Sequence, residues 1–202
     1  MGDGTYYHRS LALDGLSGSA ASPIRIQAEP RGLATVSAAW REAAEGRAGL
    51  WTAEGGGIYS APNDTPAIFG GWQGTLLFRY ETLADLQNAE TTPVPTQYSG
   101  DVFGPVHGFA WEDERIYLRL PGEADPEGEP LVFSTPTWDE GTVGSGAQPV
   151  IAVSGTPGLI FDGLRIVGSG TYGVTCDEGS PDVVFRNCLF EYCRSAVQIS
   201  GG

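Results

Sequence analysis

Short apolar segments recur at a regular interval in the last third of the chain. Within each segment apolar and polar positions alternate, which predicts a β-strand with one face toward a core. One series repeats every 23 residues and a second series every 24 residues. The first contains 150–153, 173–176 and 196–199, and the second contains 159–166 and 183–190.

Segments this short cannot bury their own apolar faces, so each repeat must stack on its neighbour, as in a solenoid. The alternation predicts columns of inward side chains that run from coil to coil. It leaves Arg165 and Leu189 outside, and it puts Gly163 and Asn187, which tolerate a left-handed backbone, at a shared bend. The expected inward columns are Ile151–Val174–Val197, Val153–Cys176–Ile199, Leu159–Val183, Phe161–Phe185, Leu164–Cys188 and Ile166–Phe190.

The segments between these strands decide which kind of solenoid to expect. A leucine-rich α/β solenoid would need about ten residues of helical pattern in each repeat. No such pattern fits between the strands, so the sequence predicts an all-β solenoid with coils of 23–24 residues over 149–202.

The middle of the chain, 37–148, lacks the repeat and reads as an inserted β-rich subdomain. Residues 37–45 are rich in helix formers and end before Gly46, which predicts a short helix. Residues 82–87 predict another. Residues 108–111 and 115–120 flank an acidic turn and predict a hairpin, with Ile116, Leu118 and Leu120 toward a core.

Charge narrows the classes of function. The 202 residues include 25 Asp and Glu against 11 basic residues, all arginine, for a net charge of −14. This balance excludes a protein that coats nucleic acid, and it argues against docking on an anionic membrane. The absence of lysine excludes a lysine base, a Schiff base or a P-loop. No apolar stretch reaches the roughly 20 residues of a membrane span, so membrane insertion is not expected.

Two motifs carry a resemblance to a known family: "VIAVSGTPGLIFDGLRIVGSGTYGV" and "VVFRNCLFEYCRSAVQISGG". They resemble the right-handed parallel β-helix (PbH1 repeat) of the pectin-lyase-like superfamily. The N-terminal "DGTYYHRSLALDGLSGSAASPIRIQAEP" resembles the first coils of secreted bacterial β-helix proteins, here residues 1–36. The resemblance implies a polysaccharide partner and an extracellular or cell-surface location.

The last repeat stops just after its first strand, and no secretion signal precedes the first coils. We therefore expect the chain to be an N-terminal fragment of a longer secreted protein. A coil without a following repeat would leave its apolar edge open, which predicts self-association through the C-terminal coil.

Lyases of the superfamily need a base and a cation on outward positions of successive coils. The outward candidates are Arg165, whose planar fork suits a uronate carboxylate, Glu191 and Arg194, with Asp177 and Glu178 in a turn. Without lysine and without a repeated basic column, a complete lyase site is not expected in this segment. Related hydrolases use clustered aspartates, and no adjacent outward positions hold such a cluster.

All five tryptophans lie in the middle region. Sugar rings present flat C–H faces that stack on aromatic side chains, so an exposed tryptophan there is a candidate carbohydrate contact. Trp72, within a glycine-rich segment, and Trp111 are the two candidates, and the alternative for each is a place in the core of the subdomain.

Metal and thiol chemistry add little to this picture. The acidic turns at 125–129 and 177–178 carry oxygen ligands suited to Ca²⁺, but their spacing matches no known calcium loop, so no cofactor is expected. Cys176, Cys188 and Cys193 fit no zinc pattern. A Cys188–Cys193 disulfide and three small buried thiols are the alternatives.

The sequence thus favours an extracellular, carbohydrate-associated β-helix protein related to polysaccharide lyases and hydrolases, with an incomplete active site in this segment. The alternative is a non-catalytic cell-surface or adhesion scaffold.

Overall fold

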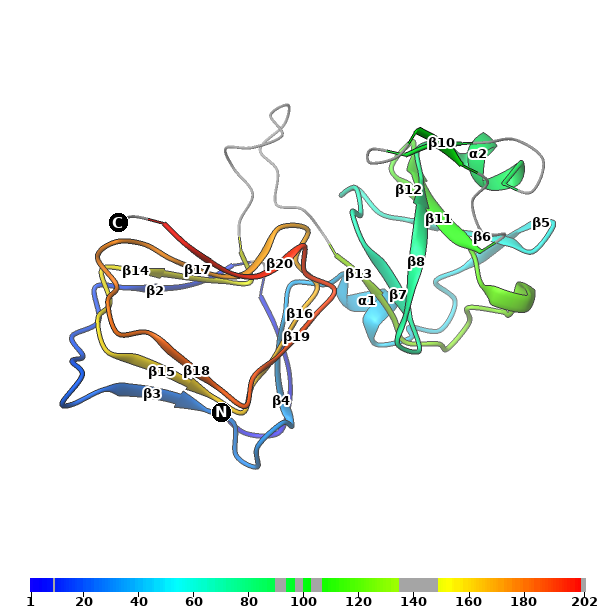
Figure 1. Cartoon of the computed structure of the whole chain (residues 1–202). Coiled ribbons are helices and arrows are strands. Elements are labelled where there is room, and N and C mark those ends of the chain that lie inside the picture. The colour runs from blue at the N-terminus through cyan, green and yellow to red at the C-terminus, as the bar shows by residue number, and fades with distance from the viewer. Residues whose placement is uncertain (9, 90–93, 97–99, 103–106, 135–148, 201–202) are drawn as a thin grey trace. The chain divides into compact units, whose positions relative to one another are not determined.

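A computed structural model describes the whole chain except residues 9, 90–93, 97–99, 103–106, 135–148 and 201–202. The chain divides into two compact units (Figure 1). The first unit combines Met1–Ala39 with Ser134–Gly202, and the second is Trp40–Phe133.

The first unit is a solenoid of three parallel sheets, here named A, B and C, which the chain visits in turn (Figure 1). This confirms the all-β solenoid expected from the repeat. Sheet A is ordered β1 (Gly4–Tyr7), β4 (Ala34–Ser37), β16 (Arg165–Val167) and β19 (Leu189–Glu191). Sheet B is ordered β2 (Leu11–Asp14), β14 (Ile151–Ser154), β17 (Tyr172–Cys176) and β20 (Ser195–Ile199). Sheet C is ordered β3 (Ile24–Gln27), β15 (Leu159–Asp162) and β18 (Val184–Arg186).

The register of these sheets matches the inward columns expected from the sequence. In sheet B, Ile151 pairs with Val174, which pairs with Val197. In sheet C, Phe161 pairs with Phe185, and their rings stack with centroids 5.1 Å apart at 4°. Apolar side chains from all three sheets meet in one buried cluster along the solenoid axis. In β20 the register holds but the burial does not, because Val197 is only half-buried and Ile199, expected to face inward, is 76% exposed.

The bend between sheets C and A requires a left-handed backbone, which Gly163 (φ 74°) and Asn187 (φ 51°) supply in successive coils. A Cβ on Gly163 would lie 2.9 Å from the Cγ atom of Arg31, so the bend needs glycine for space as well as for φ. The predicted shared bend is confirmed.

The turn between sheets B and C is organised by Asp177. Its carboxylate accepts hydrogen bonds from the hydroxyls of Ser154 (2.7 Å) and Ser180 (2.8 Å) and from the backbone N–H of Gly155 (3.1 Å). These donors, the Ser154 hydroxyl first, lower the pKa of Asp177. The turn therefore ties two successive coils together.

The second unit is built on one mixed seven-stranded sheet. Its strands, in spatial order, are β13 (Leu131–Phe133), β7 (Gly70–Trp72), β8 (Thr75–Tyr80), β11 (Gly108–Glu112), β12 (Arg115–Arg119), β6 (Ile58–Pro62) and β5 (Thr52–Gly55). A separate hairpin pairs β9 (Val94–Thr96) with β10 (Gly100–Val102), and η1 (Pro121–Glu123) follows β12. The predicted hairpin is confirmed as β11 and β12.

Each face of the seven-stranded sheet has its own apolar cluster. One cluster includes Phe109, Leu118 and Phe133, and the indoles of Trp40 and Trp51 pack beside it. The other centres on Tyr80 and Leu86, with additional contacts from Tyr117 and Phe78. The residues expected to face a core, Ile116, Leu118 and Leu120, are all buried.

Both helices of the second unit are shorter than the sequence predicted. The helix predicted over 37–45 is wrong in its first half, because Ser37 ends strand β4 and only Arg41–Ala44 form α1. Strand pairing with β1 and β16 overrides local helix propensity there. The second helix is confirmed as α2 (Leu83–Gln87), with a capping box between Thr82 and Asp85.

In chain order, the second unit takes the place of one short connection between sheet A and sheet B. Strand β4 of sheet A precedes it and β14 of sheet B follows it. Later coils make the same connection with residues 168–171 or 192–194. Among the described residues, no helix is long and apolar enough to cross a membrane.

Candidate functional site

The four side chains proposed as sugar contacts fall into separate places. Arg165 and Glu191 lie on the solenoid, whereas Trp72 and Trp111 belong to the second unit. The two tryptophans are at opposite ends of β8 in the sheet. Trp72 pairs with Thr75 at the start of that strand, and the residue before Trp111 pairs with Tyr80 at its end. The structure therefore joins Arg165 with Glu191 but does not join the tryptophans.

Arg165 and Glu191 occupy outward positions of sheet A in successive coils. The Nε and Nη2 atoms of Arg165 donate to Oε2 of Glu191 at 3.0 and 2.5 Å. Both side chains are partly exposed, so this ion pair contributes at most about 1 kcal/mol to stability. Its chemical consequence is larger, because the guanidinium already holds a carboxylate and does not present an empty fork.

A second acidic group of the solenoid, Asp162, is also paired with arginine. Its side chain is 2% exposed and lies 3.2 Å from Nη2 of Arg31 and 3.6 Å from Nη1 of Arg25. The side-chain amide of Asn187 donates to its other oxygen at 3.1 Å. Asp162 thus fixes the bend between sheets C and A and is not available to a substrate.

Trp111 is tied to the backbone of its own unit. Its Nε1 donates to the carbonyl oxygen of Asn63 at 2.9 Å, and its ring packs against the cluster around Phe109. Asn63 is itself buried, with its amide oxygen bound to the N–H of Thr65. The Nδ2 atom of Asn63 has no partner among the residues that the structure describes. These contacts fit the alternative interpretation of Trp111, a place in the core.

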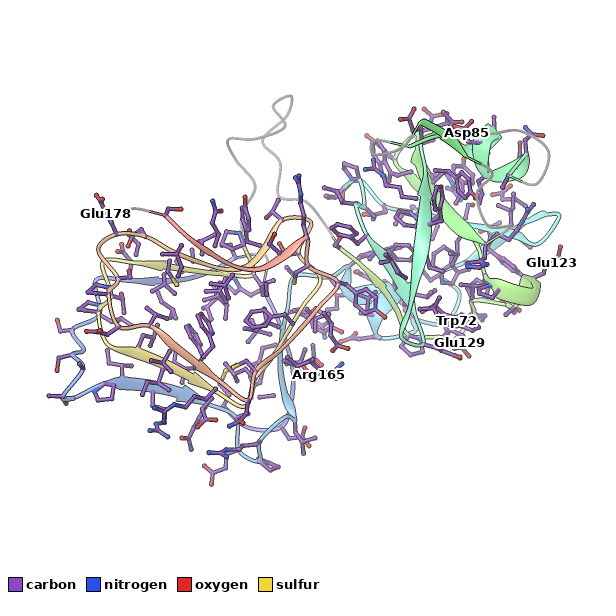
Figure 2. The ribbon with its side chains drawn as sticks, in the orientation of Figure 1. Trp72, Asp85, Glu123, Glu129, Arg165 and Glu178 are labelled. Atoms are coloured by element: carbon purple, nitrogen blue, oxygen red, sulfur yellow. The ribbon has the colours of Figure 1, made fainter. Side chains whose placement is uncertain are left out.

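Trp72 is different, because its polar edge meets a side chain. Its Nε1 donates to Oε2 of Glu129 at 3.0 Å, and Nε2 of the exposed Gln73 donates to the same oxygen at 3.2 Å. Figure 2 shows Trp72 and Glu129 next to each other in the second unit. The half-buried indole, the amide and the carboxylate form what we call the Trp72 cluster.

Local geometry places these three groups together. The β7–β8 hairpin turns through Gln73 (φ 48°) and Gly74 (φ 79°), both left-handed, as in a type I′ turn. Residue Glu129 is held by a loop in which its own N–H donates to the carbonyl of Pro126. A neighbouring segment supports this loop, since the N–H of Gly49 donates to the Glu127 carboxylate.

Sequence reasoning found only Trp72 of this cluster. Gln73 follows Trp72 inside the Gly-Gly-Trp-Gln-Gly segment. The glycines of this segment indicate a turn, and that signal could have pointed to Gln73 as a neighbour of the indole. Glu129 lies 57 residues from Trp72, and no periodicity links the two positions. Only the pairing of β13 with β7 brings the segment before β13 to this hairpin.

The three cysteines are free thiols, so the disulfide alternative is not formed. Burial raises the pKa values of Cys176 and Cys193, which keeps both groups protonated and unreactive near neutral pH. In the described ranges, no group of three or more His, Cys, Asp or Glu side chains is arranged to hold a metal ion.

The fold is that of an all-β protein: a parallel β-solenoid with a β-rich unit inserted in one of the connections between its strands. No family model matches the chain. No curated protein matches it either. A solved structure described as the complex structure of XylC with xylose is similar, with a TM-score of 0.49 and 11% identity. The similarity covers 86% of this chain and 35% of that chain, so this chain spans about a third of its length.

Proposed function

We propose that this chain is an extracellular polysaccharide-binding protein of the right-handed, pectin-lyase-like β-helix type, and that its second unit carries a sugar contact. The observation that carries the proposal is the Trp72 cluster: an indole, an amide and a carboxylate joined by two hydrogen bonds at a hairpin.

The chemistry of the cluster suits a sugar ring. An indole offers an apolar face for the C–H groups of the ring, and its position is fixed by the bond to Glu129. The carboxylate of Glu129 accepts hydrogen bonds, and the amide of Gln73 both donates and accepts. Neighbouring hydroxyl groups of a sugar need such a mixture of acceptors and donors.

The solenoid supports binding rather than turnover in this segment. A lyase needs a free cation for the uronate carboxylate, and Arg165 is engaged by Glu191 in the adjacent coil. We therefore expect no turnover of alginate, pectate or chondroitin by this polypeptide.

Binding to a glycan array tests the proposal, followed by calorimetric titration of the best neutral oligosaccharide. Gln73→Ala and Glu129→Ala should each weaken binding about 5- to 50-fold, the loss of one or two hydrogen bonds in a sugar complex. Trp72→Ala should abolish measurable binding because the stacking surface is lost.

Trp111→Phe is the matched control, since it changes another half-buried indole of the same sheet, and it should leave the affinity unchanged. A wild-type protein that binds no glycan would overturn the proposal. So would variants of the Trp72 cluster that bind as the wild type does. A reproducible rise in unsaturated-uronate absorbance with purified protein would contradict the expected lack of turnover.

A further inference from the structure

We infer that Glu129 makes the Trp72 cluster selective for neutral sugars and that uronic-acid polysaccharides are excluded from it. This inference rests on the proposed function, and it names the substrate class of that site. The ligands inferred here are neutral, whereas the resemblance to lyases would suggest acidic polysaccharides.

The first observation is the state of the Glu129 carboxylate. Two N–H donors, from Trp72 and Gln73, converge on its Oε2 atom, and such bonds are strongest to a charged acceptor. Its Oε1 atom has no hydrogen-bond partner in the part of the chain that the structure describes. A fixed anionic oxygen is therefore available to a ligand beside the indole.

The second observation is that no basic side chain in the described part of the chain forms an ion pair with this carboxylate. The described ion pairs of the chain join Asp162, Glu45 and Glu191 to arginines, and none of them involves Glu129. Two more carboxylates, those of Asp125 and Glu127, lie in the same loop, and their hydrogen-bond partners among the described residues are backbone N–H groups. The loop is therefore a local concentration of negative charge.

These charges separate two classes of sugar. A neutral hexose or pentose brings hydroxyl groups, which donate to a carboxylate, and its stacking on Trp72 carries no electrostatic cost. A uronic acid brings a second carboxylate into the same few ångströms, where like charges repel. Since no arginine among the described residues is paired with Glu129, the repulsion is not offset.

Arg47 is the basic residue that tests this reasoning most directly. It lies between Gly46, which packs against the carbonyl of Gly128, and Gly49, which binds Glu127. Its guanidinium has no ion pair among the described residues, so it is open to a ligand carboxylate. If Arg47 did so, acidic sugars would bind as well as neutral ones.

The experiment measures the affinity of the full chain for hexamers of equal length by isothermal titration. Cellohexaose, xylohexaose and mannohexaose are the neutral probes, and hexagalacturonate and hexamannuronate are the acidic probes. We expect the best neutral probe to bind at least about tenfold more tightly than either acidic probe at low salt.

Glu129→Gln keeps the shape of the side chain and removes its charge, so it should raise the affinity for the acidic probes and reduce the preference to about twofold. The preference of the wild type should also shrink in about 0.5 M NaCl, which screens the repulsion. Glu178→Gln, at an exposed position of the solenoid (Figure 2), gives the same change in net charge and should leave the preference intact.

The outcomes separate the two proposals. If no hexamer binds, the proposed function fails and the selectivity fails with it. If acidic probes bind as tightly as neutral ones, or if Glu129→Gln leaves the preference unchanged, the selectivity alone is overturned. If the wild type binds the acidic probes and Arg47→Gln does not, Arg47 makes the site selective for acidic sugars, and the inference is overturned.

Discussion

At the scale of single residues, the carboxylates of this acidic chain differ by their partners. Asp162 is buried and ion-paired with two arginines, Asp177 is bound by hydroxyl and N–H donors, and Glu129 faces an indole and an amide. The sequence placed a shared bend at Gly163, the residue that follows Asp162. It did not predict the partners of Glu129, because their contact depends on strand pairing across 57 residues.

Asp177 gives a prediction about pH. The pKa of this group is lowered in the folded chain, chiefly by the hydroxyl of Ser154, so its ionised form stabilises the fold. That contribution is fully present above the ordinary pKa of aspartate, about 3.9, and it is lost as the pH falls through the lower folded value. Asp177→Asn should therefore lower the melting temperature at pH 7, and the difference from wild type should shrink below about pH 4.

Thermal unfolding followed by circular dichroism at pH 7 and pH 3 measures this effect. Glu178→Gln removes the neighbouring exposed charge and should change the melting temperature little at either pH. A difference between wild type and Asp177→Asn that is the same at both pH values would contradict the assigned role.

At the scale of elements, alternation of apolar and polar positions was a reliable guide in the solenoid. Each strand there has one face toward the core, so a shift of one residue would expose the whole apolar set. That constraint explains why the Ile151, Val174 and Val197 column is found as predicted. Composition was a poorer guide at 37–45, where pairing of Ser37 in sheet A outweighs helix propensity.

The stacked phenylalanines of sheet C give a prediction at this scale. Phe161 is fully buried between two coils, so Phe161→Ala should reduce the free energy of unfolding by about 3–5 kcal/mol. Phe185, in the next coil, is only half-buried, and Phe185→Ala should cost clearly less. Val184→Ala, on the outer face, should cost within about 0.5 kcal/mol.

Urea denaturation, with the slope of the transition compared among the variants, measures these differences. Equal losses for Phe161→Ala and Phe185→Ala would show that the last coil is buried as deeply as the one before it. That result would contradict the exposure gradient along the column.

At the scale of the whole molecule, each unit has its own apolar core. The cluster along the solenoid axis and the two clusters of the seven-stranded sheet share no residue. The sequence identified a non-repeating segment from the loss of the repeat. It could not reveal how that segment pairs its strands, since the order β13-β7-β8-β11-β12-β6-β5 follows no period.

Separate cores predict separate unfolding events. Differential scanning calorimetry of the full chain should resolve two transitions, because each unit has a buried apolar core of its own. Phe161→Ala should lower one transition and Leu118→Ala, in the other unit, should lower the other. A single transition that both variants lower equally would mean that the two units unfold as one.

The insertion also has a consequence for the order of events during synthesis. Sheet B joins β2 to β14, and at the end of these strands the N–H of Leu16 donates to the hydroxyl of Thr156, 140 residues later. At about 5–20 residues per second, the ribosome needs on the order of 10 s to synthesise the residues between Leu16 and Thr156. All of Trp40–Phe133 emerges within this interval, so the second unit can complete its sheet while β2 and β3 of the first coil still wait for theirs.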